Sequence, residues 1–165
     1  MNSVRLQRYC VANGDFTLAS GGNSRVKFDV VGLFHDHATR TEAVAALVNI
    51  LDQVDVADVL VGVELGGALL AAMLPFHLED QLWIARKSGE FEGIRPFYQP
   101  KTAVILEDVV TTGGPALKVV DGLQKRGIKT TAVVALVTRG GHAELAKRGI
   151  PLLSSYTMNE FGFIS

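Results

Sequence analysis

The 165-residue sequence has a single cysteine, five prolines and no long uninterrupted run of apolar residues. Because Cys10 has no partner within the chain, an internal disulfide is excluded and we expect a reducing, cytoplasmic location. The longest apolar stretch, residues 57–75, is interrupted by two acidic residues and a pair of glycines. Such a stretch is typical of a strand, a loop and a helix, so we expect no transmembrane segment and no membrane partner. The first twelve residues mix polar and apolar side chains, which does not resemble a secretory leader.

An excess of charge of one sign is also missing. The 16 Lys and Arg residues are balanced by 17 Asp and Glu, for a net charge of -1, and no basic stripe is present, so nucleic-acid binding is not expected. The four histidines are scattered without Cys or Glu at ligand spacing, which argues against a structural metal site. With 48% hydrophobic residues and no repeat or linker, the sequence predicts one domain over residues 1–165.

From Thr39 onward, helical and extended patterns alternate. Helices are expected at Thr41–Leu51, Gly67–Leu74, Pro115–Arg126 and Gly141–Lys147, and strands at Val59–Val63, Leu82–Ala85, Ala103–Leu106, Thr131–Val137 and Leu152–Tyr156. This alternation predicts an α/β fold, a parallel sheet flanked by helices on both faces, with a ligand at the carboxyl ends of the strands where their order switches. Before it, extended segments at Phe16–Ser20 and Val26–Val31, separated by a glycine turn, predict a small N-terminal β-hairpin hood.

The most informative stretch of the sequence is Ala103–Pro115. Four apolar residues form a strand that brings Glu107 and Asp108 to its carboxyl end, and a loop of hydroxyl residues and glycines, Thr111–Gly114, then opens a helix. Backbone N–H groups of such a loop can bind a phosphate at the helix N-terminus, and proline fits the first helical turn. A plain helix N-terminus after a strand that ends in solvated acids explains each residue singly, but it does not explain the ordered set.

This stretch resembles the 5-phosphoribosyl-1-diphosphate (PRPP) motif of type I phosphoribosyltransferases. The resemblance implies that Glu107 and Asp108 engage the ribose hydroxyls and that Thr111–Gly114 surround the 5-phosphate. Three further segments are similar to orotate phosphoribosyltransferase in particular. These are the hairpin segment Gly14–Gly21, the diphosphate-loop segment Val63–Ala68 and the segment Val137–Gly140, which carries an arginine at the family's orotate-binding position; Gly149–Leu152 resembles the family's closing strand.

The resemblance assigns roles to individual residues. It implies that Lys87 and Asp108 are catalytic, and that Mg²⁺ is bound mainly through PRPP rather than by a dedicated set of side chains. The implied PRPP-binding residues are Glu64, Leu65, Gly66, Gly67, Arg86, Lys87, Glu107, Asp108, Val109, Val110, Thr111, Thr112, Gly113, Gly114 and Pro115. The implied base-binding residues are Lys27, Phe28, Thr111 and Arg139. A homodimer is also implied.

The same residues have plainer interpretations. Gly66 and Gly67 would suit any close strand-to-helix turn, and Arg86 and Lys87 would suit a solvated turn. Arg139 would be ordinary at an exposed strand end, and Lys27 would be ordinary on the surface of a hairpin.

The sequence departs from the family pattern in two places. The loop after the Arg–Lys pair, residues 88–95, is short, lacks the family's further Lys and His, and carries two glutamates. In the hairpin, Ala19 takes the place of a lysine, and Lys27–Phe28 replaces a pair of aromatic residues.

The resemblance as a whole makes transfer of ribose 5-phosphate from PRPP to orotate the leading hypothesis. Two alternatives stay open, namely a phosphoribosyltransferase for another nucleobase and a PRPP-binding regulatory protein that has lost turnover.

Overall fold

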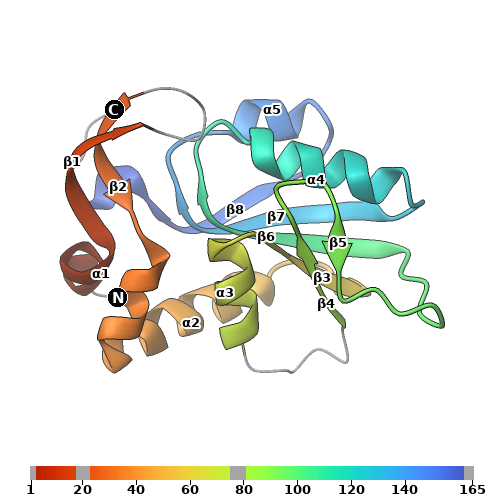
Figure 1. The fold of residues 1–165 in the computed structure, drawn as a ribbon, viewed down its shortest axis with the longest axis horizontal. Helices are drawn as coiled ribbons and strands as arrows, with labels where there is room; N and C mark the ends of the chain where they lie inside the picture. The colour runs from red at the N-terminus through yellow and green to blue at the C-terminus, as the bar shows by residue number, and fades with distance from the viewer. Residues whose placement is uncertain (1–2, 18–22, 75–80, 162–165) are drawn as a thin grey trace.

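The computed structural model of the chain describes residues 3–17, 23–74 and 81–161. Its centre is a six-stranded sheet with the strand order β5-β4-β3-β6-β7-β8 (Figure 1). These strands are β3 (Val59–Val63), β4 (Gln81–Ala85), β5 (Phe91–Glu92), β6 (Thr102–Val110), β7 (Lys129–Thr138) and β8 (Leu152–Thr157). All neighbouring strands run parallel except the short edge strand β5, which pairs with β4 in the antiparallel sense.

Helices cover both faces of this sheet (Figure 1). The α-helices are α1 (Ser3–Cys10), α2 (His37–Leu51), α3 (Gly66–Met73), α4 (Gly114–Gln124) and α5 (His142–Ala146). One apolar core contains buried residues of α1, α2 and α3, and a second core contains those of α4 and α5. Alternation along β6 serves both cores, since Ile105 packs in the second and Leu106 in the first.

The N-terminal part of the chain forms a separate two-stranded sheet. Strands β1 (Val11–Thr17) and β2 (Asn23–Phe28) pair antiparallel, and a 3₁₀-helix, η1 (Val30–His35), leads from them to α2. Phe28 at the end of β2 is buried and its ring lies 6.2 Å from that of Phe161 in a second 3₁₀-helix, η2 (Met158–Phe161). The hairpin is thus joined to the first core of the main sheet.

The sequence patterns predicted this architecture but misplaced some boundaries. The α/β class, the parallel sheet and the N-terminal hairpin are confirmed. The strand predicted at Val26–Val31 is wrong beyond Phe28, because the Asp29 carboxylate accepts a hydrogen bond from the Val31 amide and starts η1 there. The strand predicted at Ala103–Leu106 is too short, since β6 continues to Val110.

Four elements were not predicted, namely α1, β5 and the two 3₁₀-helices η1 and η2. The end of the first predicted hairpin strand, Leu18–Ser20, the glycines of its turn and the lysine-replacing Ala19 lie outside the described residues. None of the helices in the described part of the chain combines the length and hydropathy of a membrane-spanning segment.

Candidate active site at the switch between β3 and β6

The candidate site lies where the direction of strand order reverses. After β3 the chain adds β4 on one side, and after β4 and β5 it returns to the other side of β3 to form β6. The helices that follow the two central strands pack on opposite faces, α3 in the first core and α4 in the second. The carboxyl ends of β3 and β6 therefore mark the switch point of the sheet, the place where open α/β sheets bind ligands.

The loop between β3 and α3 packs tightly against the end of β6. An added Cβ at Gly66 would lie 2.1 Å from Oδ2 of Asp108, and one at Gly67 would lie 2.1 Å from the carbonyl oxygen of Leu106. No side chain caps the N-terminus of α3. Its first backbone N–H groups are therefore available to an anion, and only glycine permits this approach to the carboxylate-bearing strand. The peptide bond between Glu64 and Leu65 is cis.

Glu107 and Asp108 lie within β6 rather than after it. Asp108 lies on the α3 side, since its carboxylate packs against Gly66 at the start of that helix, and Glu107 is buried beside it. Burial, with a smaller effect of the neighbouring Asp108 charge, raises the pKa of Glu107 to about 8. Glu107 thus carries a proton over much of the neutral range and can donate a hydrogen bond to a hydroxyl group.

The charge of Asp108 is set by several neighbours. Burial raises its pKa most, backbone hydrogen bonds lower it, and the Asp29 and Lys27 charges act on it in opposite directions. The effect of Lys27, which is exposed on β2, is the smallest of these. The sequence analysis did not single out Asp29, whose only signal was its place as the acid after the hairpin strand.

The turn between β6 and α4 has the form of an anion-binding loop. Gly113 adopts the left-handed conformation, with φ of 78°, as the N-cap of α4, and no side chain caps the helix there. The hydroxyl of Thr112 accepts a weak hydrogen bond from the amide of Gly114 at 3.3 Å. Pro115 occupies the first turn, as expected from the sequence. Apart from the Gly114 amide, the first backbone N–H groups of α4 are therefore not capped by a side chain.

Arg86 and Lys87 open a short turn between β4 and β5. Nε of Arg86 donates to Oε1 of Glu92 at 2.8 Å, and its NH1 lies 3.5 Å from Oε1 of Glu64. The second oxygen of Glu64 accepts a hydrogen bond from the backbone amide of Lys87 at 3.0 Å. Glu64 therefore ties the β3–α3 loop to the β4–β5 turn, and two carboxylates surround the guanidinium of Arg86.

Phe91 of β5 anchors the same turn through its aromatic ring. The ring of Phe91 packs edge-on against Trp83, with 6.2 Å between the ring centroids, and its centroid lies 4.7 Å from the guanidinium carbon of Arg126 in the turn after α4. These contacts hold β5 against the body of the protein. The turn brings the Arg–Lys pair to the same sheet edge as the β3–α3 loop.

Arg139 follows the end of β7 at the same edge. Its backbone amide donates to the carbonyl oxygen of Val110 at 2.8 Å, which places it beside the end of β6. Its NH1 donates to Oγ of Ser24 on β2 at 3.1 Å. Arg139 therefore bridges the main sheet and the hairpin, a contact that the sequence analysis missed because 115 residues separate the partners.

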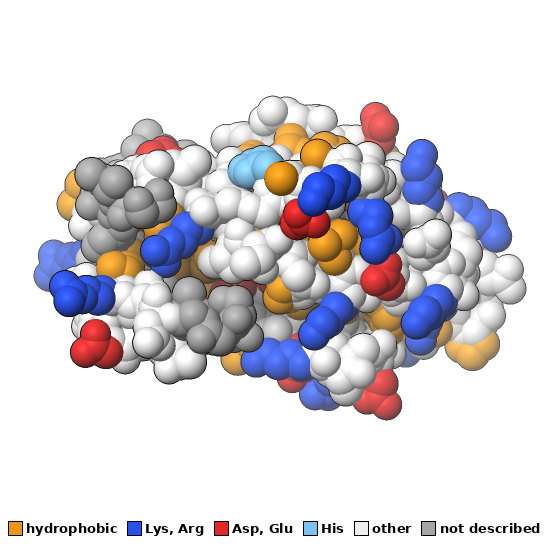
Figure 2. Space-filling model, turned by 90° about the horizontal axis from the view of Figure 1, so that it is seen from above, with side chains coloured by type: hydrophobic (Ala, Val, Ile, Leu, Met, Phe, Trp, Pro, Cys, Tyr) orange, Lys and Arg blue, Asp and Glu red, His pale blue; other side chains and the backbone are white. Residues whose placement is uncertain are grey.

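The proposed base residues are thus placed unevenly. Lys27 and Arg139 are exposed and Thr111 is partly exposed, whereas Phe28 is buried against Phe161 and contributes to the core. No three His, Cys, Asp or Glu side chains gather into a metal site anywhere in the described ranges. On the face shown in Figure 2, basic side chains are scattered among acidic ones rather than joined into a stripe.

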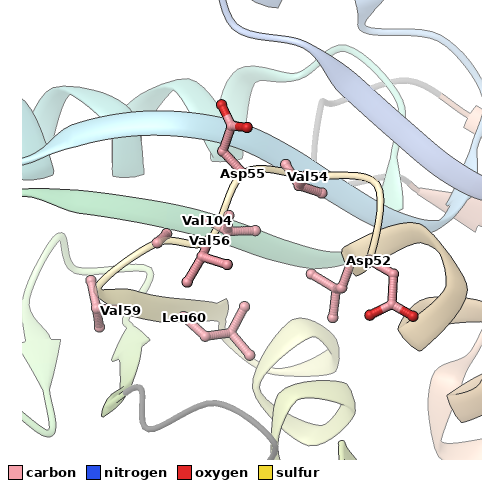
Figure 3. A pocket seen from close by; sticks show the side chains of 9 residues that line it. Asp52, Val54, Asp55, Val56, Val59, Leu60 and Val104 are labelled. Carbon is pink, nitrogen blue, oxygen red and sulfur yellow. The ribbon is translucent and has the colours of Figure 1, made fainter.

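A separate pocket of about 200 Å³ lies beside the start of β3, at the other end of that strand (Figure 3). Its lining is mostly aliphatic, with two carboxylates at Asp52 and Asp55 and no basic side chain. Such a lining does not suit a phosphate ligand, so this pocket is not the candidate site.

Comparisons with known proteins agree with the geometry of the switch-point site. No protein-family model matches the sequence. The chain is 33% identical to the orotate phosphoribosyltransferase of Aeropyrum pernix over 94% of its own length and 87% of that protein, and 30% identical to that of Methanococcus maripaludis over 93% and 87%. It resembles the crystal structure of the Aeropyrum pernix enzyme with a TM-score of 0.84 and 32% identity, covering 98% of this chain and 96% of that one. The chain therefore belongs to the orotate phosphoribosyltransferase family of pentosyltransferases, with the type I phosphoribosyltransferase fold.

Proposed function

We propose that this protein transfers ribose 5-phosphate from PRPP to orotate, giving orotidine 5′-phosphate and diphosphate. The observation that carries the proposal is that two helix N-termini without a side-chain cap follow the carboxyl ends of the neighbouring strands β3 and β6, with the Asp108 carboxylate packed against the start of α3. The start of α4 would bind the 5-phosphate, and the start of α3 would bind the diphosphate. Family membership selects orotate among the bases.

The transfer requires positioning and charge stabilisation rather than a protein nucleophile. As the C1–O bond lengthens, positive charge grows on the sugar and negative charge grows on the leaving diphosphate. Asp108, beside the proposed ribose position, would stabilise the sugar, and the N–H groups of α3 with Lys87 would stabilise the diphosphate. Glu107, protonated in part near neutral pH, would donate a hydrogen bond to a ribose hydroxyl.

The donor set at this edge suits a magnesium ion held mainly by the substrate. Hard carboxylate oxygens are present at Asp108, while Glu107 is protonated in part near neutral pH and Glu64 is engaged with Arg86 and Lys87. When bound, Mg²⁺ would neutralise charge on the diphosphate. We propose that Asp108 is the residue that lies nearest to this Mg²⁺ ion, with ribose oxygens of PRPP between the carboxylate and the ion.

We further propose that the protein is a homodimer, which light scattering would test against the 17.7 kDa mass of one chain. We also propose a reducing location, which suits the buried free thiol of Cys10.

The test is release of diphosphate from PRPP and Mg²⁺, scanned across orotate, uracil and the purine bases. We expect release with orotate and a fall of at least about a hundredfold in Asp108→Asn, since the variant loses a charge at the reacting sugar. Asp121→Asn is the matched control, because Asp121 is a surface residue of α4 that pairs with Arg148. Release with another base and none with orotate would contradict the proposal.

One observation favours a second candidate, a PRPP-binding protein without turnover. The guanidinium of Arg86 is already paired with Glu92 and Glu64, so its charge is partly neutralised before a diphosphate arrives. That reading predicts saturable PRPP binding with no diphosphate release for any base.

A further inference from the structure

Ser24 occupies an unusual place for a polar side chain of the hairpin. It lies on β2 and is 8% exposed. Its Oγ donates to the carbonyl oxygen of Val26 at 2.7 Å and accepts from the Val26 amide at 3.2 Å. The third bond of this oxygen is the one received from NH1 of Arg139 at 3.1 Å. A hydroxyl has one donor and two acceptor sites, so the bonding capacity of Ser24 is fully used.

Arg139 belongs to the arginines of the described chain whose hydrogen-bond partner is neutral. Arg5, Arg86 and Arg148 each have a carboxylate oxygen within 4.0 Å. Across the described ranges, Arg139 has no such ion pair, and its guanidinium donates to the neutral hydroxyl of Ser24. The guanidinium is therefore held in place while its positive charge and most of its N–H donors stay available.

We propose that Ser24 is a positioning residue for recognition of the base: it orients Arg139 toward the carboxylate of the orotate ring without neutralising its charge. This inference rests on the proposed function, in which Arg139 binds that carboxylate. A bidentate bond between guanidinium and carboxylate depends on the angle of the planar fork, so an anchor on one nitrogen limits the orientations that the fork samples. The bond between Ser24 and Arg139 also connects the hairpin to the end of β7.

The neutrality of the anchor is the feature that selects the ligand. An acidic residue at position 24 would orient the guanidinium as firmly, but it would satisfy the charge internally and weaken attraction for an acidic base. Serine leaves a cation at the base position.

The experiment compares binding of two nucleotides that differ only in this carboxylate, orotidine 5′-phosphate and uridine 5′-phosphate, by isothermal titration calorimetry. In Ser24→Ala we expect affinity for orotidine 5′-phosphate to fall about five- to tenfold, as for loss of one hydrogen bond at a charged group, while affinity for uridine 5′-phosphate changes less than about twofold. Ser24→Thr keeps the hydroxyl and should bind both as the wild type does. Ser24→Asp should lose most of the preference for orotidine 5′-phosphate.

Thr130→Val is the matched control, because it removes a buried hydroxyl at the opposite end of β7 that has no hydrogen-bond partner in the described chain. It should leave both affinities unchanged. Equal weakening of both nucleotides in Ser24→Ala would mean that Ser24 only stabilises the hairpin, and no weakening of either would mean that it does not orient Arg139; both results overturn the inference. A wild-type protein that binds the two nucleotides equally would overturn the proposed role of Arg139 itself, and the inference with it.

Discussion

Glu107 is an acid placed where its charged form is disfavoured. It is 7% exposed, its pKa is raised to about 8 by burial and by the Asp108 charge, and its side chain makes no hydrogen bond to the described residues that would compensate. In the unfolded chain the ordinary pKa of a glutamate is about 4.5. The folded protein therefore binds a proton more tightly than the unfolded chain, and stability must fall as pH rises between these two values.

Glu107→Gln tests this charge state. The variant keeps a polar side chain that does not ionise, so we expect its stability to exceed that of the wild type by about 4–5 kcal/mol at pH 8.5. At about pH 3.5 and below, where the wild-type carboxyl is protonated in both states, the difference should be close to zero. Thermal unfolding at both pH values measures it, as a gap of roughly 8–20 °C that opens with rising pH.

Glu144→Gln is the control for this measurement, because Glu144 is an exposed residue paired with Lys147 at 2.6 Å. Surface ion pairs contribute little, so its stability should follow the wild type at each pH. If the unfolding temperatures of Glu107→Gln and the wild type ran parallel from pH 4.5 to 8.5, the raised pKa of Glu107 would be wrong.

At the scale of elements, the site depends on how closely α3 approaches β6. Gly62, Gly66 and Gly67 line this approach, and at Gly67 the atom in the way is a backbone oxygen that cannot swing aside. The sequence Val63–Ala68 predicted a loop suited to a diphosphate, but the same glycines are needed to bring the two strands' carboxyl ends together. Function and packing thus require the same residues here.

Gly67→Ala should therefore destabilise the fold. A Cβ would stand 2.1 Å from the carbonyl oxygen of Leu106, so the helix must shift, and we expect a loss of about 3 kcal/mol, seen as a fall of roughly 6–12 °C in Tm. Gly114→Ala is the matched control at the other helix N-terminus, where the nearest heavy atom to an added Cβ is Oγ1 of Thr112 at 3.5 Å. Its Tm should change by no more than about 2 °C; equal losses in the two variants would contradict the close packing of α3 on β6.

Sequence patterns predicted the buried strands and most helices because apolar periodicity reports directly on burial. They failed where polar residues lie inside an element or where the partner is distant in the chain. The strand ending at Leu106 was cut short since Glu107 and Asp108 look like loop residues, although β7 pairs with β6 as far as Val110. The strand β5 has only two residues, which is too short for a sequence pattern to specify. Its position depends on the contacts that Phe91 makes with Trp83 and with Arg126.

The candidate site divides in the same way. The loops Gly66–Gly67 and Thr111–Gly114 could be found from local sequence, because glycine and hydroxyl residues after a strand have a local structural reason. The bond from Arg139 to Ser24 and the carboxylates around Arg86 could not, because they depend on loops that only the folded sheet brings together. The residue roles at this edge stay predictions until variants are measured.

Considered over the entire protein, the proposed ligand would contact several elements that are far apart in the sequence. The β3–α3 loop, the β4–β5 turn, the start of α4 and the end of β7 all meet at one sheet edge (Figure 1). None of these segments would offer the same donors in the unfolded chain. A ligand that bridges them binds only the folded state, and mass action then stabilises the whole protein.

PRPP with Mg²⁺ should consequently raise the unfolding temperature. At a ligand concentration about 100 times Kd, the linkage gives about 2.7 kcal/mol, which corresponds to roughly 5–11 °C for a chain of this length. Ribose 5-phosphate, which lacks the diphosphate, should give a smaller shift because it leaves the start of α3 without a ligand. Asp108→Asn should reduce the PRPP shift and Asp121→Asn should retain it. This measurement needs no turnover, so a full shift without diphosphate release would identify a PRPP-binding protein, whereas no shift in the wild type would remove the switch-point edge from consideration as the PRPP site.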